Sequence, residues 1–418
     1  MQDNEKKPAL RFKGFTDPWE QRKLGDAFER VVRKNTNNES RLPLTISAQD
    51  GLVDQITYFN NRVASRDVSN YYLVYNGEFA YNKSTSDGYP FGAVKRLDWY
   101  EKGVLSTLYI VFALKHPEKD DSDFMTVFYD TDRWHRGVAE RAAEGARNHG
   151  LLNISADDFF DIDTTMPEDK VEQEKIGRLL KKLDTLITLH QRKYEKLVNI
   201  KKSMLDKMFP QNGASVPEIR FKGFTDPWEQ RKLTNLCEKF TDGDWIEAKD
   251  QSDSGVRLVQ TGNVGVTEYL DKPNNKKWIS FETFEQLHCE EVYPGDILIS
   301  RLPEPAGRAC IMPNLGTKMI TAVDCTIVRP NAVTSTRFLL QYLSSQAYFD
   351  AVNTCLAGGT RQRISRGNLA QFNVPIPSSK IEQEKIGEVL EKLDTLITLH
   401  QREHIKSILE VKLVKRNE

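Results

Sequence analysis

The chain has 418 residues, of which 39% are hydrophobic, 28% charged and 10% aromatic, and its formal net charge is -1. This length predicts two or three domains, and this composition excludes a disordered chain. No apolar run approaches the roughly 18 residues that span a bilayer, and the N-terminus is too polar for a secretory signal, so a cytoplasmic protein is expected. All five cysteines lie in the second half without CxxC spacing, which favours reduced, buried thiols over disulfides or a zinc site.

Two segments of the chain occur twice. The entry segment RFKGFTDPWEQRKL at residues 11–24 returns unchanged at residues 220–233, an offset of 209 residues. The stretch at residues 170–192 returns with few changes at residues 380–402, an offset of 210 residues. Each half therefore consists of an entry segment, a long middle and a terminal helix. A period this long indicates duplicated domains, because solenoid repeats have only about 20 to 50 residues.

The first middle segment, residues 25–166, has strand-like runs at residues 71–75, 78–82 and 104–114. The dipeptide Asn76-Gly77 between two of these runs is a turn signal. A polar, basic stretch follows at residues 133–150. We expect an α+β domain with a mixed or antiparallel sheet.

The first repeated helix, residues 170–209, shows apolar residues at heptad spacing, which predicts a coiled-coil seam. Pro167 marks its beginning and Pro210 its end. A helix of this length rises about 60 Å, which exceeds one turn of B-DNA, about 34 Å. The apolar residues fall on two lines, Ile176, Leu183, Leu197 and Met204 on the first and Leu179, Leu186 and Ile200 on the second.

The second middle segment, residues 234–377, is almost unalignable with the first but is also expected to be α+β, with strand-like runs at residues 256–266, 291–302, 308–313 and 321–330. Its most suggestive feature is the stretch at residues 358–366. Paired glycines let the backbone approach a ligand, and arginine and glutamine offer donors to guanine, adenine or phosphate. An ordinary solvated basic loop explains the stretch equally well. Residues 144–148 occupy the corresponding place in the first half.

The second repeated helix, residues 380–418, begins after Pro377 and continues the heptad pattern. The two helices are expected to run antiparallel, because the chain must leave the first, build a domain and come back. His190 and His400 occupy seam positions of leucine and are interpreted as polar residues that fix the register, against a catalytic or metal role. Gly177 and Gly387 indicate a close helix approach or a partner contact.

The paired entry segments, the paired helices and the motifs at residues 258–263, 294–296 and 374–377 resemble the specificity subunit of Type I restriction-modification systems. The resemblance covers essentially the whole chain. It implies an α+β fold in which two globular target recognition domains are joined by two long antiparallel coiled-coil helices, as a pseudo-two-fold internal repeat. The domain boundaries expected are 1–166 for the first recognition domain, 167–210 for the first spacer helix, 211–377 for the second recognition domain and 378–418 for the second spacer helix.

The resemblance also implies a non-catalytic function. Each domain reads one half of a bipartite double-stranded DNA target through the major groove, while the helices space the halves and dock two methyltransferase subunits. Two restriction subunits with motor and nuclease activity join them. This chain is expected to hold no metal and no cofactor, because S-adenosylmethionine, ATP and Mg are bound by the partner subunits. The first middle lacks the QTGN and PGD signals of the second.

Two sets of site residues are expected. The candidate DNA contacts are Arg361, Gln362, Arg363, Arg366, Thr261, Asn263, Arg301, Lys83, Arg133, Arg136, Arg147 and Asn148. The candidate partner-docking residues are Glu172, Lys175, Gly177, Glu382, Lys385 and Gly387.

The charge distribution indicates that binding is shared with partners. Residues 170–209 carry a formal charge of +6, residues 380–418 are neutral, and the remainder carries -7. Because phosphate neutralisation supplies most non-specific affinity, the chain alone is expected to bind DNA weakly.

Two other classes of protein remain open. A stand-alone nucleic-acid enzyme is disfavoured because the chain has no [DN]PP[YF], GxGxxG, GxxxxGK[ST] or HExxH motif. A duplicated coiled-coil DNA-binding regulator is the third interpretation. Adjacent methyltransferase and helicase-nuclease genes would favour the specificity subunit.

Overall fold

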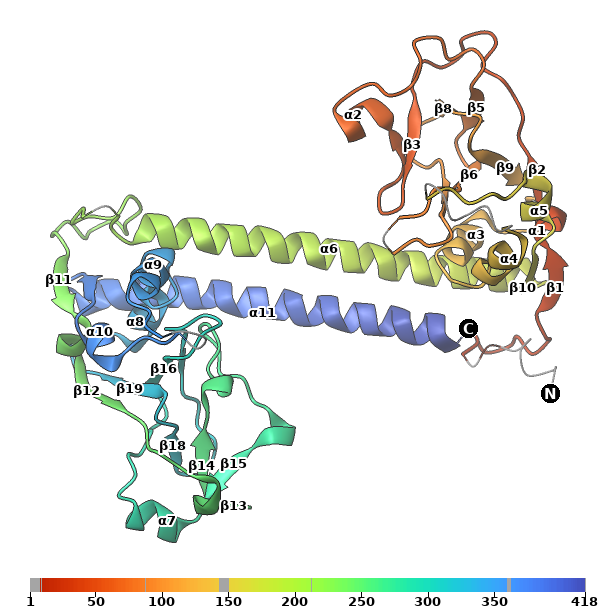
Figure 1. Cartoon of the computed structure of the whole chain (residues 1–418). Helices are drawn as coiled ribbons and strands as arrows, with labels where there is room; N and C mark the ends of the chain where they lie inside the picture. The colour runs from red at the N-terminus through yellow and green to blue at the C-terminus, as the bar shows by residue number, and fades with distance from the viewer. Residues whose placement is uncertain are drawn as a thin grey trace. The chain divides into compact units, whose positions relative to one another are not determined.

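The computed structural model describes residues 8, 10–86, 88–142, 150–211, 213–358 and 362–417, with side chains up to residue 410. Contacts divide the chain into two compact units, each of which is described by itself (Figure 1). Unit 1 comprises residues 1–189 and 404–418, and unit 2 comprises residues 190–403. The division passes through both long helices, so each unit contains one globular domain and parts of α6 and α11.

Unit 1 combines short strands with short helices. Its central sheet is antiparallel with strand order β2-β9-β6-β7, and three further strand pairs surround it. The elements are β1 (Glu20–Lys23), α1 (Leu24–Ala27), β2 (Phe28–Arg30), β3 (Leu44–Ser47), β4 (Gly51–Asp54), α2 (Gln55–Phe59), β5 (Tyr72–Tyr75), β6 (Phe79–Asn82), β7 (Ala93–Arg96), β8 (Lys102–Leu105), β9 (Ile110–Leu114), α3 (Ser122–Tyr129), α4 (His135–Arg141), α5 (Ala156–Phe160), β10 (Asp163–Met166) and α6 (Lys170–Met208).

Aromatic side chains form the core of unit 1. Phe28, Phe79 and Phe112 project from three neighbouring strands, and the Phe79 and Phe112 rings stack at 5.6 Å. Helices α3 and α4 lie beside the beginning of α6 (Figure 1). Ile176 and Leu180 of α6 belong to the same buried cluster, so the first turns of the long helix are part of this domain's core.

Unit 2 has two four-stranded sheets, with strand orders β12-β19-β16-β17 and β13-β15-β14-β18. The pair β14–β18 is parallel, so the second sheet is mixed, whereas the pairs of the first sheet are all antiparallel. The elements are β11 (Glu229–Lys232), η2 (Leu233–Leu236), β12 (Cys237–Asp242), η3 (Ala248–Asp250), β13 (Gln251–Ser252), β14 (Val256–Val259), η4 (Thr261–Asn263), η5 (Pro273–Asn275), β15 (Lys277–Ile279), α7 (Phe281–Gln286), β16 (Ile297–Ser300), β17 (Ala309–Ile311), β18 (Met319–Thr321), β19 (Cys325–Pro330), α8 (Thr336–Tyr342), α9 (Gln346–Thr354), α10 (Arg366–Ala370), β20 (Asn373–Ile376) and α11 (Lys380–Asn417).

Some predicted strand runs are divided by turns. The run at residues 104–114 contains β8 and β9, because Tyr109 N–H bonds to the carbonyl of Ser106 and closes a turn between them. The run at residues 256–266 ends as a strand at Val259. There, the backbone N–H of Gln260 donates to the Asn263 side chain and a 3-10 turn follows. Hydrophobic runs thus locate strands, while side-chain capping decides where they end.

The long helices run antiparallel. Within unit 2, Lys201 of α6 pairs with Asp394 of α11, and Nδ1 of His190 lies 3.3 Å from Nδ1 of His400. The residue numbers fall along one helix as they rise along the other. Within unit 1, Nδ1 of His404 lies 3.2 Å from the carbonyl oxygen of Ile187. His190 and His400 are equivalent residues of the repeat, so their mutual contact is what a local two-fold axis requires.

Candidate nucleic-acid interface

Three arginines converge in unit 2 around two carboxylates. Arg301 follows β16, Arg363 lies in the loop before α10, and Arg366 begins α10. Nε of Arg301 lies 3.6 Å from Asp242, and its Nη2 lies 3.8 Å from Asp324. Arg363 lies 3.5 Å from Asp324, and Arg366 lies 3.8 Å from Asp242. The structure therefore brings together three of the predicted DNA contacts and adds two aspartates that the sequence did not indicate.

The cluster presents two of its arginines to solvent. The side chains of Arg363 and Arg366 are 61% and 45% exposed, while Arg301 is 8% exposed. Two backbone hydrogen bonds between Ala357 and Arg363 close the loop that carries Arg363. Ile364 N–H donates to the carbonyl of Arg301 and joins this loop to β16. Gln362 is exposed at the same place, whereas Arg361 lies outside the described residues.

Thr261 and Asn263 lie in η4 and contribute to the loop's own structure. Asn263 is 3% exposed, accepts from the N–H of Gln260 at 3.0 Å and donates to the carbonyl of Leu270 at 2.9 Å. The Thr261 carbonyl accepts from Arg308 at 3.0 Å. In this arrangement Asn263 presents no free amide group to a ligand, and a contact between these two residues and DNA stays a prediction.

Arg308 is a structural residue that sequence reasoning missed. Its guanidinium donates to the carbonyls of Val264, Leu302, Pro303 and Pro305, besides Thr261. Burial lowers the pKa of Arg308 from its usual value. These bonds tie the η4 loop to the loop after Arg301. No sequence spacing identified this arginine, because its acceptors are backbone atoms of two separate loops.

In unit 1 the predicted contacts do not form an equivalent cluster. Lys83 donates to the carbonyl of Ile154 at 3.3 Å, the guanidinium of Arg133 lies 5.2 Å from the Trp19 ring centroid, and Arg136 pairs with Glu140 one helical turn away. Arg147 and Asn148 lie outside the described residues.

Unit 1 instead has a polar hollow of about 400 Å³ beside Gly150, the last residue of the predicted basic stretch. Thr85 N–H donates to the carbonyl of Gly150 at 2.7 Å, which joins the hollow to the end of that stretch. Two aromatic side chains on its wall, Tyr58 and Phe59, are each 49% exposed. Amide and hydroxyl side chains can form hydrogen bonds with the edges of bases. The amide and hydroxyl residues of the hollow were not predicted from the sequence, because they are uncharged and do not form a glycine pair. The polar lining residues include Gln49, Asn82, Ser84, Thr85 and Ser86.

The predicted docking residues of the first helix anchor α6 to its own domain. Arg11 of the entry segment makes two hydrogen bonds to Glu172, Nε–Oε1 at 2.6 Å and Nη2–Oε2 at 2.7 Å. Glu172 is 1% exposed, and its hydrogen bonds raise the pKa of Arg11. The adjacent Gln173 accepts from the N–H of Asp121, the residue that caps α3. The entry segment and α3 are thus both fixed to the first turn of α6.

The second anchor repeats the first. Arg220 bonds to Glu382 at 2.7 and 3.0 Å, Glu382 is 1% exposed, and these bonds raise the pKa of Arg220. Gln383 accepts from the N–H of Ser335, the residue before α8. Both arginines lie in the entry segment that occurs twice, so its repetition was the signal for this role.

The repeated glycines and lysines belong to the same anchors. A Cβ on Gly177 would lie 2.6 Å from the backbone nitrogen of Phe124, and one on Gly387 would lie 2.8 Å from that of Phe338. Glycine is therefore required where each long helix crosses a short one. Lys175 and Lys385 remain exposed and lie 4.6 and 5.2 Å from the ring centroids of Phe15 and Phe224, respectively. Docking of partners at these six residues stays a prediction.

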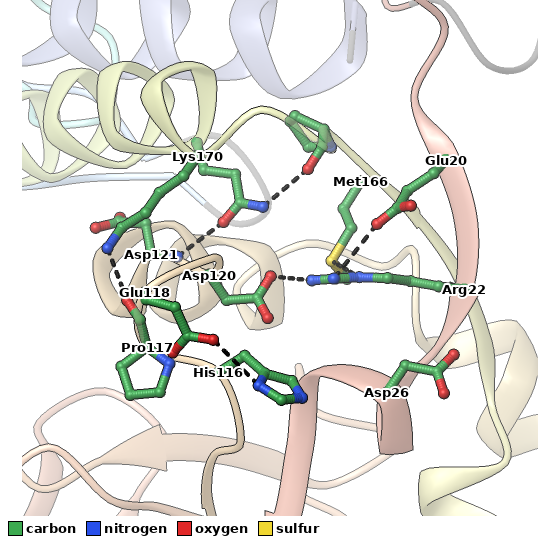
Figure 2. Close-up of polar contacts among 12 residues, drawn as sticks. Glu20, Arg22, Asp26, His116, Pro117, Glu118, Asp120, Asp121, Met166 and Lys170 are labelled. Atoms are coloured by element: carbon green, nitrogen blue, oxygen red, sulfur yellow. Dashed lines mark hydrogen bonds and ion pairs between the residues drawn. The ribbon is translucent and has the colours of Figure 1, made fainter.

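Figure 2 shows a further ion pair in the unit 1 anchor. Arg22 of β1 pairs with Asp120, which is 1% exposed at its side chain, and Nε of Arg22 lies 3.0 Å from the Met166 sulfur. Lys170, the first residue of α6, donates to the carbonyl of Pro117 at 2.7 Å. The entry strand, the segment before α3 and the beginning of α6 therefore meet at one point.

Two features of the described residues bear on metal binding and on membrane insertion. Within the described ranges, no three His, Cys, Asp or Glu side chains are grouped so that they could hold a metal ion. The helices of those ranges also include none with the length and apolarity needed to cross a membrane.

Comparison with known proteins identifies the class. Residues 225–410 match the family described as "Type I restriction modification DNA specificity domain". The specificity subunit of the Type I restriction enzyme MjaVIII from Methanocaldococcus jannaschii is 21% identical over 318 residues, which cover 72% of this chain and 70% of that protein. The crystal structure of a Type I restriction-modification S subunit from M. genitalium aligns with a TM-score of 0.54 at 14% identity, covering 98% of both chains.

These matches define a DNA-recognition component that is not itself an enzyme. The predicted resemblance to the specificity subunits of Type I restriction-modification systems is confirmed, with the DNA specificity domain of that family matched at residues 225–410. The predicted α+β fold with two long antiparallel spacer helices is likewise confirmed.

Proposed function

We propose that this chain reads a bipartite double-stranded DNA sequence, with one recognition domain for each half. The observation that carries the proposal is the pair of matching anchors, Arg11–Glu172 and Arg220–Glu382, which hold two unrelated domains on the beginnings of two near-identical helices. A DNA target in two parts requires two different recognition domains on equivalent structural supports. An internal repeat within one chain provides such supports.

The candidate base contacts differ between the units. In unit 2 they are Arg363, Arg366 and Gln362, whose planar donors suit guanine and adenine in the major groove. In unit 1 they are the polar side chains of the hollow beside Thr85. Because the two sets are chemically different, the two half-sites should differ in sequence.

The long helices are the proposed docking surface for two methyltransferase subunits. They keep large apolar side chains exposed, including Leu189 at 56% and Leu399 at 49%. Apolar residues left exposed along a helix are typical of a surface that a partner covers. The other exposed apolar residues of these helices include Leu179, Val198, Ile200, Leu396, Ile405 and Leu409.

The remaining chemistry is assigned to partners. The methyltransferase subunits would bind S-adenosylmethionine, and two restriction subunits would bind ATP and Mg. The assembly would act on cytoplasmic DNA. Since the residues outside the two helix segments carry a formal charge of -7, the partners should also supply much of the phosphate contact.

Methylation mapping tests the proposal. The chain is expressed with its methyltransferase subunits, and modified sites are mapped across a genome. We expect a two-part motif with a constant gap. The paired variants Arg363→Ala and Arg366→Ala should relax one half of the motif and leave the other unchanged. A contiguous motif, or relaxation of both halves together, would contradict the proposal.

The spacing role has its own test. Insertion of four residues, about one helical turn, after Asn199 should lengthen the unread gap and preserve both half-sequences. An unchanged gap in the mapped motif would show that the helices do not set the spacing.

A further inference from the structure

The five-residue cluster of unit 2 has an unusual geometry. All four arginine–aspartate separations lie between 3.5 and 3.8 Å. These distances give electrostatic attraction but exceed the 2.7–3.2 Å of a normal hydrogen bond. Nε of Arg301 and Oδ1 of Asp324 are buried and have no hydrogen-bond partner among the described residues. The carboxylates therefore attract the arginines without using up their N–H donors.

The two aspartates are less exposed than two of the arginines, and Asp242 is also held by a side-chain hydrogen bond. Asp242 accepts from the hydroxyl of Thr326 at 3.0 Å, and the backbone of Asp324 accepts from the N–H of Arg301 at 2.9 Å. The side chains of Asp242 and Asp324 are only 24% and 29% exposed, less than those of Arg363 and Arg366. The cluster thus combines two partly buried negative charges with two solvent-facing guanidinium groups.

Such an arrangement affects two kinds of DNA contact differently. A phosphate attracts any exposed arginine by charge alone, and a carboxylate near that arginine offsets much of this attraction. A guanine edge instead accepts two directed hydrogen bonds from one guanidinium, which requires free donors in a defined orientation. A carboxylate at 3.5 Å satisfies both conditions, because it orients the group and leaves the donors free.

We propose that Asp242 and Asp324 are positioning residues for sequence discrimination. They hold Arg363 and Arg366 over Arg301 in a reading orientation and weaken the attraction of these arginines for phosphate. DNA without the correct bases then gains little from the cluster. This inference rests on the proposed function, because it assumes that unit 2 reads bases.

The test uses Asp242→Asn and Asp324→Asn in the complex with the methyltransferase subunits. Asparagine keeps the size of the side chain and, at residue 242, the oxygen that accepts from Thr326, but it removes the charge. Binding is measured at several salt concentrations, to the mapped target and to a scrambled duplex of equal length. We expect affinity for the scrambled duplex to rise about twofold to fivefold and discrimination to fall about tenfold.

Asp253→Asn is the matched control. Asp253 is exposed between β13 and β14, outside the cluster, and the change in charge is the same. It should leave discrimination unchanged. The conservative variant Asp324→Glu should recover part of the discrimination lost in Asp324→Asn, because it restores the charge.

Two results would overturn the inference. One is discrimination that stays at the wild-type value in both cluster variants. The other is a parallel loss of affinity for both duplexes, which a purely structural role predicts. If the wild-type complex itself shows no preference for its mapped target, the proposed function fails instead, so the two failures are distinguishable.

Discussion

The two units share an anchor and differ in what the anchor supports. In both, an entry-segment arginine holds a buried glutamate of the long helix by two hydrogen bonds, and the next glutamine accepts from the backbone N–H of the residue before a short helix. Both units also have an equivalent strand pair, β1–β10 in unit 1 and β11–β20 in unit 2. The larger sheets, the cores and the exposed polar groups are different. The comparison teaches that the entry segment and the beginning of each long helix form a constant support, while the rest of each domain differs.

The shared segments also meet different surroundings. Arg22 and Arg231 are the same residue of the repeat, yet Arg22 is 16% exposed and pairs with the buried Asp120, whereas Arg231 is 41% exposed and pairs with Glu229. The counterpart region of unit 2 has Asn331 and Thr334, which bond to each other. Identity of sequence therefore does not imply identity of energetic role.

The largest expected loss of stability comes from substitutions that break the arginine–glutamate anchor shared by the two units. Glu172→Ala and Glu382→Ala should each destabilise their own unit by about 3–5 kcal/mol, because each strands a largely buried arginine. Hydrogen exchange of the β1–β10 amides reports on unit 1, and that of the β11–β20 amides reports on unit 2. The paired replacement Arg11→Met with Glu172→Met should cost less than Glu172→Ala. Losses under about 1 kcal/mol in either unit would contradict this account of the anchor.

The second-largest effect is a loss of stability that is expected to differ between the two units. Arg22→Met should cost about 3 kcal/mol, because it leaves the Asp120 carboxylate buried without its cation. The identical change Arg231→Met should cost less than about 1 kcal/mol, because both members of that pair are well exposed. Chemical denaturation of the two variants measures the difference. Equal losses in the free energy of unfolding would show that the surroundings of this residue do not affect its contribution to stability.

The smallest effect concerns pH. Burial raises the pKa of Asp244 in unit 2 to about 6, with the neighbouring Glu290 adding to the shift. Because the folded chain binds this proton more tightly than the unfolded chain, whose pKa is 3.8, stability from this group is lost as pH rises from about 4 through 6. Asp244→Asn should therefore be stabilising by about 1–2 kcal/mol at pH 7, and much less at pH 4.

Among the described carboxyl groups of unit 1, the four with a shifted pKa are shifted in the opposite direction to Asp244. The pKa values of Asp67, Glu118, Asp123 and Asp161 are all lowered, so their contribution is present above the unfolded pKa and is lost as pH falls. Thermal denaturation at pH 4, 5 and 7 compares Asp244→Asn with the wild type. A variant that is equally stabilised at every pH would refute the assignment to Asp244.

Local sequence indicated which basic side chains are exposed. Arg363 and Arg366 are exposed as the basic stretch predicted, and their contact with DNA stays a prediction. Glu172 and Glu382 were predicted to dock a partner, because nothing in their local sequence indicates the arginines that bind them. Their arginines lie 161 and 162 residues away. For Asn263, the motif did not reveal that its amide is used within its own loop.

The amino-acid sequence alone determined the duplication, the two long helices, their antiparallel course and the family. These follow from heptad periodicity, proline boundaries and repeated segments, which are all readable along the chain. Only the tertiary structure decided that the repeated arginines anchor the helices, that Arg301, Arg363 and Arg366 share two aspartates, and that unit 1 has a polar hollow instead. The physical reason is that these contacts join residues far apart in sequence, and their burial depends on how the intervening strands pack.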